Sequence, residues 1–415
     1  MSQNSELVPK RRFKEFENAG DWEQRKLKEV STIYDGTHQT PKYTVSGVMF
    51  LSVENIKTLK SNKYISQEAF DENFKIKPEK GDILMTRIGD IGTPNVVESD
   101  EEMAYYVSLA LIKSKMHPYF MKANILATSF QNELWKRTLH IAFPKKINKN
   151  EIGETILNFP NYVEQKKIGS FFKHLDDTIT LHQHKLDKLN NLKQSYLYQM
   201  FPQNGQKVPT LRFAGFSGDW KRHKFFDTIN TTIDFRGRTP KKLGMDWSDS
   251  GYLALSALNV KNGYIDESVD AHYGNEELYR KWMSGKELKK GQVIFTTEAP
   301  MGNVAQVPDN KGYILSQRTI AFDVNDAKIT NDFLAVLLRS PNVFNNLTSL
   351  SSGGTAKGVS QKSLANLNIN IPTNLNEQSK IGNFFKILDD TIKLHQQELE
   401  KLKNLKEAYL NEMFV

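Results

Sequence analysis

A stretch of 39 residues occurs twice in this chain, and it limits the possible folds more than any other feature. Residues 164–202 read EQKKIGSFFKHLDDTITLHQHKLDKLNNLKQSYLYQMFP, and residues 377–415 read EQSKIGNFFKILDDTIKLHQQELEKLKNLKEAYLNEMFV. Most of the aligned residues are identical. A repeat of this length indicates that the chain contains two copies of one structural unit.

Each copy of the repeat predicts one long helix. Residues 164–200 contain no proline, and Leu, Lys, Gln and Glu dominate them. Apolar residues recur at alternating steps of four and three, which is typical of a coiled coil. The alternative is two ordinary long helices in a globular core, but we expect the copies to pack on each other as a rigid spacer. The apolar positions are Ile168, Phe172, Leu175, Ile179, Leu186, Leu189, Tyr196 and Met200 in the first copy and Ile381, Phe385, Leu388, Ile392, Leu399, Leu402, Tyr409 and Met413 in the second.

The composition excludes several classes of protein. The chain has 56 Lys+Arg against 48 Asp+Glu, and the net charge of +8 is consistent with a polyanionic partner. Without cysteine, disulfides and thiolate metal sites are excluded. No apolar run approaches the roughly 20 residues that cross a bilayer, and the first residues do not form a secretory signal. We therefore expect a cytoplasmic protein with no membrane association.

A shorter repeat precedes each globular part. Residues 8–22, VPKRRFKEFENAGDW, return at 208–220 as VPTLRFAGFSGDW. The chain therefore contains a lead-in segment, a globular domain and a long helix, twice in that order. The predicted boundaries are 1–26 for the first lead-in segment, 27–163 for the first domain, 164–201 for the first helix, 202–221 for the linker and second lead-in segment, 222–376 for the second domain and 377–415 for the second helix.

The two globular segments share a plan of short strands and few helices. Each has one predicted helix, at 119–138 in the first segment and at 332–350 in the second. This alternation predicts an α+β fold with two small α/β domains. Strand-like runs lie at 48–56, 79–92, 106–113 and 155–161 in the first segment and at 252–260, 289–302, 316–324 and 367–373 in the second.

Three motifs together identify a family. They are the lead-in motif at 209–220, the Gly-Asp and Gly-Gln pairs before predicted strands at 81–82 and 291–292, and the pattern E-Q-x-K-I-x-x-F-F…L-D-x-x-I at each helix start. With these motifs, essentially the whole chain resembles the specificity subunit of a type I restriction–modification system. The resemblance implies two target recognition domains related by a pseudo-twofold axis, each reading one half of a split site in double-stranded DNA. It also implies that the long helices pack as an antiparallel coiled coil.

The resemblance implies partners as well. The helices would set the gap between the half-sites and dock two methyltransferase subunits, and restriction/translocase subunits would join that core. Because the two domains differ in sequence, we expect an asymmetric target. A helix of this length spans roughly 55 Å. Major-groove stretches recur on one face of DNA about every 34 Å, so a rod of this length can address two of them. The predicted docking residues are Phe171, Phe172, Leu175, Phe384, Phe385 and Leu388.

The candidate DNA contacts are residues that suit phosphates or base edges. Lysines bind phosphates, whereas Arg reads guanine and Gln reads adenine. The alternative for each lysine is a solvated surface residue, and the alternative for Arg87 is a strand-end salt bridge with Asp82 or Asp90. The candidates for base edges are Arg87, Arg236, Arg238, Arg318 and Gln361, and the other DNA-binding candidates are Thr40, Lys42, Lys145, Lys146, Lys241, Lys242, Lys357 and Lys362.

A glycine-rich stretch, SSGGTAKGVSQ at 351–361, allows the backbone to approach a phosphate closely. The first domain departs from this pattern, because it has IAFPKKINKNEI at 141–152 instead. No G-x-x-x-x-G-K-[ST] string is present, so nucleotide hydrolysis finds no support.

No catalytic, cofactor or metal site is expected. Adjacent aspartates on a helix point about 100° apart, so we interpret Asp176-Asp177 and Asp389-Asp390 as structural or partner-binding pairs. The spacing of His182 and His184 is poor for chelation, and His182 is predicted to be an interhelical contact. Three hypotheses follow: a targeting subunit without catalytic activity, a purely structural coiled-coil scaffold, and a fused enzyme with a degenerate active site.

Overall fold

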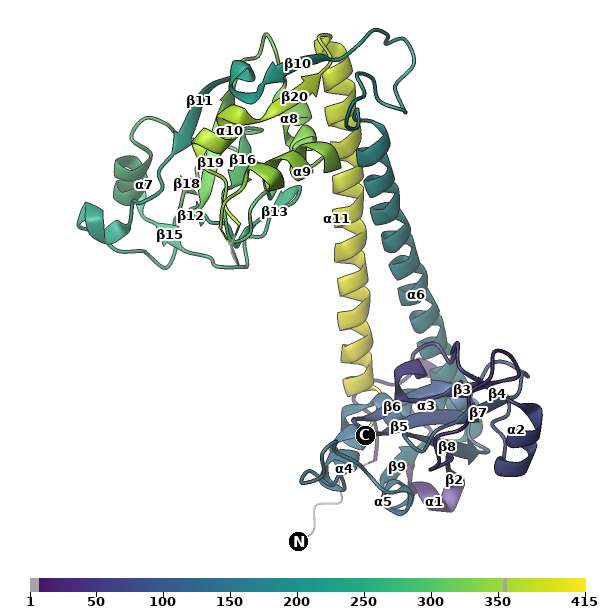
Figure 1. Ribbon diagram of the computed structural model, residues 1–415. Helices are drawn as coiled ribbons and strands as arrows, with labels where there is room; N and C mark the ends of the chain where they lie inside the picture. The colour runs from purple at the N-terminus through teal and green to yellow at the C-terminus, as the bar shows by residue number, and fades with distance from the viewer. Residues whose placement is uncertain (1–6, 354–356) are drawn as a thin grey trace. The chain divides into compact units, whose positions relative to one another are not determined.

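The computed structural model describes residues 7–353 and 357–415. The two predicted helices are present as α6 (Tyr162–Gln199) and α11 (Leu375–Glu412) (Figure 1). The chain divides into two compact units, which are Met1–Gln183 with Gln397–Val415 (unit 1) and His184–Gln396 (unit 2). Each unit therefore holds one globular domain, part of α6 and part of α11.

Within each unit, the two helices pack in opposite directions. In unit 1, Phe172 contacts Phe414, with ring centroids 5.7 Å apart, and Phe171 meets Tyr409 at 5.0 Å. Asp176, further along α6, binds Lys406, which lies earlier in α11. The predicted apolar positions are buried or half-buried throughout both helices. The prediction of an antiparallel coiled coil is therefore confirmed.

The described residues of unit 1 form three small sheets. Their strand orders are β2-β8-β5-β6, β4-β3-β7 and β1-β9. All pairs are antiparallel except β3 with β7. The strands are β1 (Glu23–Lys26), β2 (Ser31–Asp35), β3 (Val48–Leu51), β4 (Tyr64–Ile65), β5 (Ile83–Ile88), β6 (Asp90–Val96), β7 (Met103–Tyr105), β8 (Leu109–Ser114) and β9 (Ile156–Phe159). The helices are α1 (Leu27–Val30), α2 (Gln67–Asn73), α3 (Pro118–Leu126), α4 (Thr128–Lys136) and α5 (Lys149–Gly153), with 3₁₀ turns at Lys14–Phe16 and Val53–Asn55.

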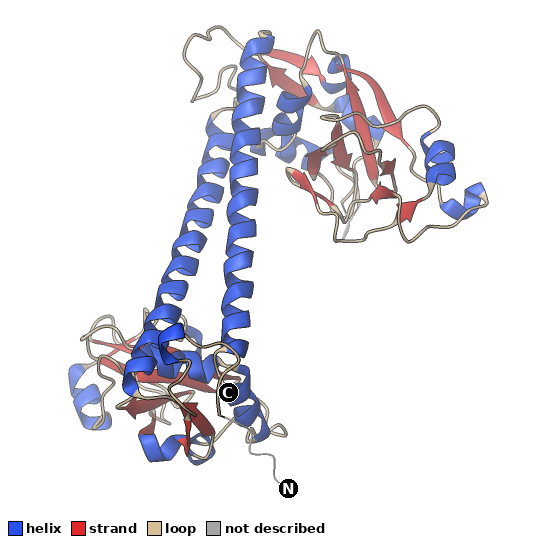
Figure 2. Ribbon diagram, turned by 180° about the vertical axis from the view of Figure 1, so that it is seen from behind, coloured by secondary structure: helices blue, strands red, loops and turns tan. Residues whose placement is uncertain are grey.

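Unit 2 repeats this plan and adds one hairpin. Its sheets have the orders β11-β19-β16-β17, β15-β12-β18, β10-β20 and β13-β14. The strands are β10 (Lys221–Lys224), β11 (Ile229–Asp234), β12 (Tyr252–Leu255), β13 (Val260–Lys261), β14 (Tyr264–Ile265), β15 (Tyr273–Gly274), β16 (Val293–Thr296), β17 (Val304–Gln306), β18 (Ile314–Leu315), β19 (Thr319–Val324) and β20 (Asn368–Ile371). The helices are α7 (Glu276–Met283), α8 (Asn331–Leu337), α9 (Pro341–Leu350) and α10 (Gln361–Asn366), with 3₁₀ turns at Phe225–Thr228 and Pro240–Leu243. Figure 2 shows strands only in the globular part of each unit.

Each of the helices predicted at 119–138 and 332–350 is in fact two helices. In unit 2, Pro341 begins α9, because a proline fits the first turn of a helix but not its interior. In unit 1, the chain is extended at Ala127, between α3 and α4. Phe120 and Phe130 share one core, yet on a straight helix they would point about 80° apart. The break lets both rings reach that core.

An aromatic cluster joins each domain to the helices. In unit 1, Trp22 from the lead-in segment packs on Phe120 of α3 and on Phe414 beyond α11. In unit 2, Trp220 occupies the same place against Phe333 and Phe201. The Trp of the repeated Gly-Asp-Trp motif is therefore a core residue that ties the lead-in segment to the helices.

Polar contacts fix the same junction. Arg12 makes two hydrogen bonds of 2.7 Å to the buried carboxylate of Glu164, and Arg212 binds Glu377 in the same way. The bonds to Glu164 raise the pKa of Arg12. This pairing explains why Arg recurs in the lead-in segment and Glu at each helix start.

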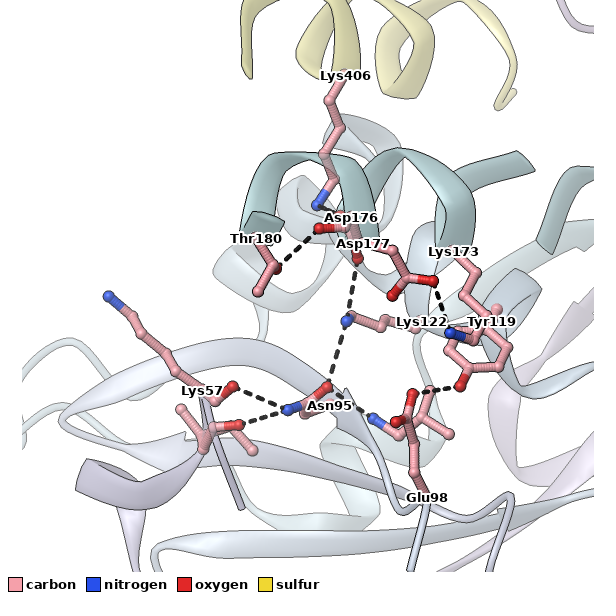
Figure 3. Close-up of polar contacts among 12 residues, drawn as sticks. Lys57, Asn95, Glu98, Tyr119, Lys122, Lys173, Asp176, Asp177, Thr180 and Lys406 are labelled. Atoms are coloured by element: carbon pink, nitrogen blue, oxygen red, sulfur yellow. Dashed lines mark hydrogen bonds and ion pairs between the residues drawn. The ribbon is translucent and has the colours of Figure 1, made fainter. Parts of the chain in front are cut away.

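The first aspartate of each pair binds two cations. In unit 1, Lys122 of α3 and Lys406 of α11 lie 3.1 and 2.6 Å from the carboxylate of Asp176 (Figure 3). Asp177 points elsewhere and pairs with Lys173. Asp176 thus connects the domain, α6 and α11 at one point.

No helix in residues 7–353 and 357–415 is long and apolar enough to cross a membrane.

Candidate nucleic-acid interface

Three of the predicted DNA-binding residues of unit 2 line one open cleft. This cleft has a volume of about 470 Å³ and is bordered by Arg238, Lys241 and Arg318. Trp247 and His272 stack at its side, with ring centroids 5.6 Å apart and planes inclined by 21°. Cations beside an aromatic surface suit a nucleic acid, which presents phosphates and stacked bases.

The sequence prediction missed the aromatic part of this cleft. Trp247 lies in the polar stretch Asp-Trp-Ser-Asp, and a tryptophan in such a stretch was the available signal. Gln317, beside Arg318, also lines the cleft and was missed. Its amide can donate to and accept from a base edge.

The cleft arginines are held by the surrounding chain. Arg238 donates to the carbonyl oxygen of Trp282 and lies 4.2 Å from the ring centroid of Phe235. Arg318 is exposed, and its Nε lies 3.2 Å from a carboxylate oxygen of Glu298. Its backbone is left-handed, with φ 65°, a strained conformation for a residue other than glycine. Such strain is common at binding sites.

A second cluster in unit 2 lies at the end of β11. The carboxylate of Asp234 accepts hydrogen bonds from the side chains of Arg236, at 2.9 and 2.5 Å, and Gln361, at 2.9 Å. Burial acts to raise the pKa of Asp234, but these bonds outweigh it and lower the pKa. The same carboxylate raises the pKa of Arg236. Two predicted base-reading residues are therefore oriented by one anion.

Unit 1 has the equivalent carboxylate, Asp35, at the end of β2. Arg87 forms an ion pair with Asp35 and donates to the carbonyl oxygen of Ile147 at 3.0 Å. Lys149 lies 4.0 Å from Asp35, at the position in α5 that Gln361 occupies in α10. Arg87 is only 5% exposed. A base contact from Arg87 stays a prediction and would require this ion pair to open.

The alternative partners considered for Arg87 are wrong. Asp82 pairs with Lys113 instead, and Asp90 accepts from Thr86. Chain separation hid the true pair, because Asp35 is adjacent to Arg87 only through the β2-β8-β5 pairing.

The loops after α4 and α9 occupy the same place in the two units, although their sequences differ. In unit 1, Lys146 bridges to Ile88 and Leu139, and in unit 2, Gly358 bridges to Glu298 and Ser352. The loop of unit 1 therefore pairs with the end of β5, and the loop of unit 2 pairs with the chain just after β16, the equivalent strand. Of the stretch 351–361, residues 354–356 lie outside the described residues.

The other predicted DNA-binding residues are on the surface. In unit 1, Lys145 lies 4.5 Å from the ring of Trp135. In unit 2, Lys242 donates to the carbonyl oxygen of Gly237 at 2.7 Å. Their DNA contacts stay predictions. Besides Lys241 of the cleft, the exposed predicted residues are Thr40, Lys42, Lys145, Lys146, Lys242, Lys357 and Lys362.

The predicted docking residues lie mainly inside the units. Phe172, Leu175, Phe385 and Leu388 are buried, and Phe171 and Phe384 are half-buried against Tyr409 and Tyr196. Docking through these six residues stays a prediction, and of the six the two half-buried rings are the most exposed. His182 contacts Glu398 of α11 at 3.6 Å, as expected of an interhelical histidine.

Comparisons with known proteins agree on one family. The family model of the type I restriction modification DNA specificity domain matches residues 19–191 and again residues 231–404. The fold is similar to that of the type I restriction-modification S subunit from M. genitalium, with a TM-score of 0.68 and 13% identity over 99% of each chain. It is also similar to a chain from a structure concerning complex assembly and conformational transition of the type I R-M system, with a TM-score of 0.50 and 13% identity over 94% of this chain and 96% of that one. Because the family model matches twice and covers most of the sequence, this chain belongs to the type I restriction–modification DNA specificity family.

Proposed function

We propose that this specificity chain is the non-catalytic DNA-reading subunit of a type I restriction–modification complex in the cytoplasm. Each of its two recognition domains, 27–163 and 222–376, reads one half of a bipartite site. The observation that carries the proposal is a cluster of hydrogen-bond donors at the same place in both units, cationic in unit 1 and cationic plus amide in unit 2. Asp35 and Asp234 mark that place at equivalent strand ends.

The two clusters differ in ways that suit different half-sites. Unit 2 presents Arg236, Arg318 and Gln361, which can form paired hydrogen bonds with guanine or adenine. At the equivalent carboxylate, Asp35, unit 1 has the buried Arg87 and the exposed Lys149. Lysine binds phosphate and can also donate to the O6 and N7 atoms of guanine. We therefore expect an asymmetric target and an affinity that falls steeply with salt.

The long helices are proposed to set the gap between half-sites and to dock two methyltransferase subunits, with restriction/translocase subunits joining that core. Large exposed leucines occur at matching positions of the repeat, Leu181 with Leu394 and Leu192 with Leu405. Unit 1 therefore contains Leu181 and Leu405, and unit 2 contains the equivalent residues Leu394 and Leu192. Equivalent apolar groups in both units support two equivalent docking surfaces.

A domain exchange tests this proposal. Residues 222–376 are replaced by the corresponding domain of another family member, and the methylated sites are mapped by sequencing in the assembled complex. We expect one half-site to change and the other to stay the same. A change in both halves would contradict separate reading by each domain.

A direct binding measurement addresses the scaffold hypothesis. Gel-shift titration of the complex with methyltransferase, at several salt concentrations, should show binding to duplex DNA that weakens as salt rises. Binding without salt dependence, or none, would favour a structural scaffold. Methyl transfer by the isolated chain with S-adenosylmethionine would contradict the non-catalytic assignment.

A further inference from the structure

The loop between α4 and α5 carries two fully exposed apolar side chains. Ile141 is 99% exposed and Phe143 is 104% exposed. Phe344 is the next most exposed phenylalanine among residues 7–353 and 357–415, at 38%. Single exposed apolar residues are ordinary, but two such large groups at one loop tip are uncommon and indicate a binding surface.

The stem of this loop is held in place. The amide N–H of Leu139 donates to the carbonyl oxygen of Lys146, and that of Gly89 donates to the carbonyl oxygen of Lys145, both at 2.8 Å. His140 packs on Trp135, with ring centroids 4.4 Å apart. Ile141 and Phe143 are therefore presented from an ordered base. Less conformational entropy is lost on binding when a loop is ordered beforehand.

The charge around the tip identifies the partner. Lys145 and Lys146 follow Phe143 after one intervening residue, Pro144, and both lysines are exposed. The loop also pairs with the strand end of the unit 1 cluster, through Ile88. Cations beside an apolar tip match duplex DNA, in which phosphates flank stacked bases. Proteins that bend DNA insert Phe or Ile between base steps in this way.

We propose that Ile141 and Phe143 form a wedge that enters a base step of the half-site read by unit 1. This inference rests on the proposed function. The wedge partly unstacks that step, so it reads the deformability of DNA as well as its base edges. Pyrimidine–purine steps unstack most easily. The first half-site should therefore contain or adjoin a TA or CA/TG step. Unit 2, whose loop carries Gly353 and Lys357 at this place, reads without a wedge.

The test uses the complete complex with methyltransferase subunits and a duplex carrying 2-aminopurine at each position of the two half-sites in turn. Unstacking raises the fluorescence of this base. Because a methyltransferase flips its target base, a rise is expected at the methylated position of each half-site with every variant. With the wild-type chain we expect one further rise, at a step of the unit 1 half-site away from the methylated position. The double variant Ile141→Ser/Phe143→Ala should lose this further rise and bind cognate DNA about ten-fold more weakly or worse, with an unchanged salt slope.

Two control variants separate the wedge from other effects. Lys145→Ala should lower the salt slope by about 0.9 and keep the fluorescence rise, because it removes one phosphate contact. Val163→Ala, an exposed apolar residue of unit 1 outside the cluster, should change neither quantity. Thermal melting of the double variant should match the wild type, because both side chains lie outside the core.

The remaining outcomes decide between the proposals. If the double variant gives the same fluorescence and the same affinity as the wild-type chain, the wedge is overturned, but half-site reading by each domain is unaffected. Weaker binding of methyltransferase to the double variant in the absence of DNA would show that the tip is a protein contact, which also overturns it. Wild-type complex that binds no specific DNA would instead overturn the proposed function.

Discussion

At the scale of single residues, a few buried ion pairs hold each domain against the long helices. In unit 2, the carboxylate of Asp389 lies 2.6 Å from Arg339 and 2.6 Å from Lys193, and all three side chains are largely buried. In unit 1, Asp176 holds Lys122 and Lys406 in the same way. The sequence showed that the aspartates come in pairs, but not which member of a pair is buried.

The substitution Asp389→Ala should destabilise unit 2. It leaves two buried cations without their anion, and breaking such a pair costs about 3 kcal/mol. Chemical denaturation followed by circular dichroism would measure the change in free energy of unfolding. Asp390→Ala, at the exposed neighbouring position, should change it by less than about 0.5 kcal/mol. Equal effects of the two substitutions would contradict a special role for Asp389.

At the scale of elements, each long helix approaches its domain too closely for any side chain but hydrogen. A Cβ on Gly382 of α11 would lie 2.6 Å from Cβ of Asp332 and 2.9 Å from the backbone nitrogen of Phe333 in α8. A Cβ on Gly169 of α6 would likewise clash with His117 and with the backbone of Phe120 in α3. The glycines look like weak points of the helices in the sequence, yet they are the contact points.

The substitution Gly382→Ala should therefore destabilise the protein, although alanine is the better helix former. An exposed glycine would gain about 1 kcal/mol from this change, whereas overpacking here should cost about 2 kcal/mol. The sign of the change in thermal midpoint checks the argument. Asn383→Ala, at the adjacent exposed position, should be neutral or slightly stabilising. A stabilised Gly382→Ala variant would refute the close contact.

At the scale of the whole molecule, the duplication makes the same contacts twice in one chain. The ion pair of Arg12 with Glu164 in unit 1 recurs as Arg212 with Glu377 in unit 2. The ion pair of Asp176 with Lys406 in unit 1 recurs as Lys193 with Asp389 in unit 2. In each unit, this second ion pair joins one residue of α6 to one residue of α11. The register between the helices is therefore fixed by charge as well as by the apolar seam.

If the helices act as a ruler, their length sets the gap between the half-sites. One heptad added to both α6 and α11 lengthens each by about 10 Å, which corresponds to about three base pairs. We expect the preferred gap to change accordingly, as measured by methylation of a library of sites with random gaps. A heptad added to α6 alone should abolish modification, because the two helices lose register. An unchanged gap in the double insertion would rule out the ruler.

The sequence by itself determined the parts that depend on periodicity and repetition. The seam spacing predicted α6 and α11, and the lead-in repeat predicted a duplicated unit, because local pattern decides which helix face is apolar. Only the tertiary structure decided the groupings that depend on distant backbone pairing. Arg87 with Asp35, Gln361 with Asp234, and the common place of the loops after α4 and α9 all follow from strand order. Strand order joins residues far apart in the chain, and no local pattern records it.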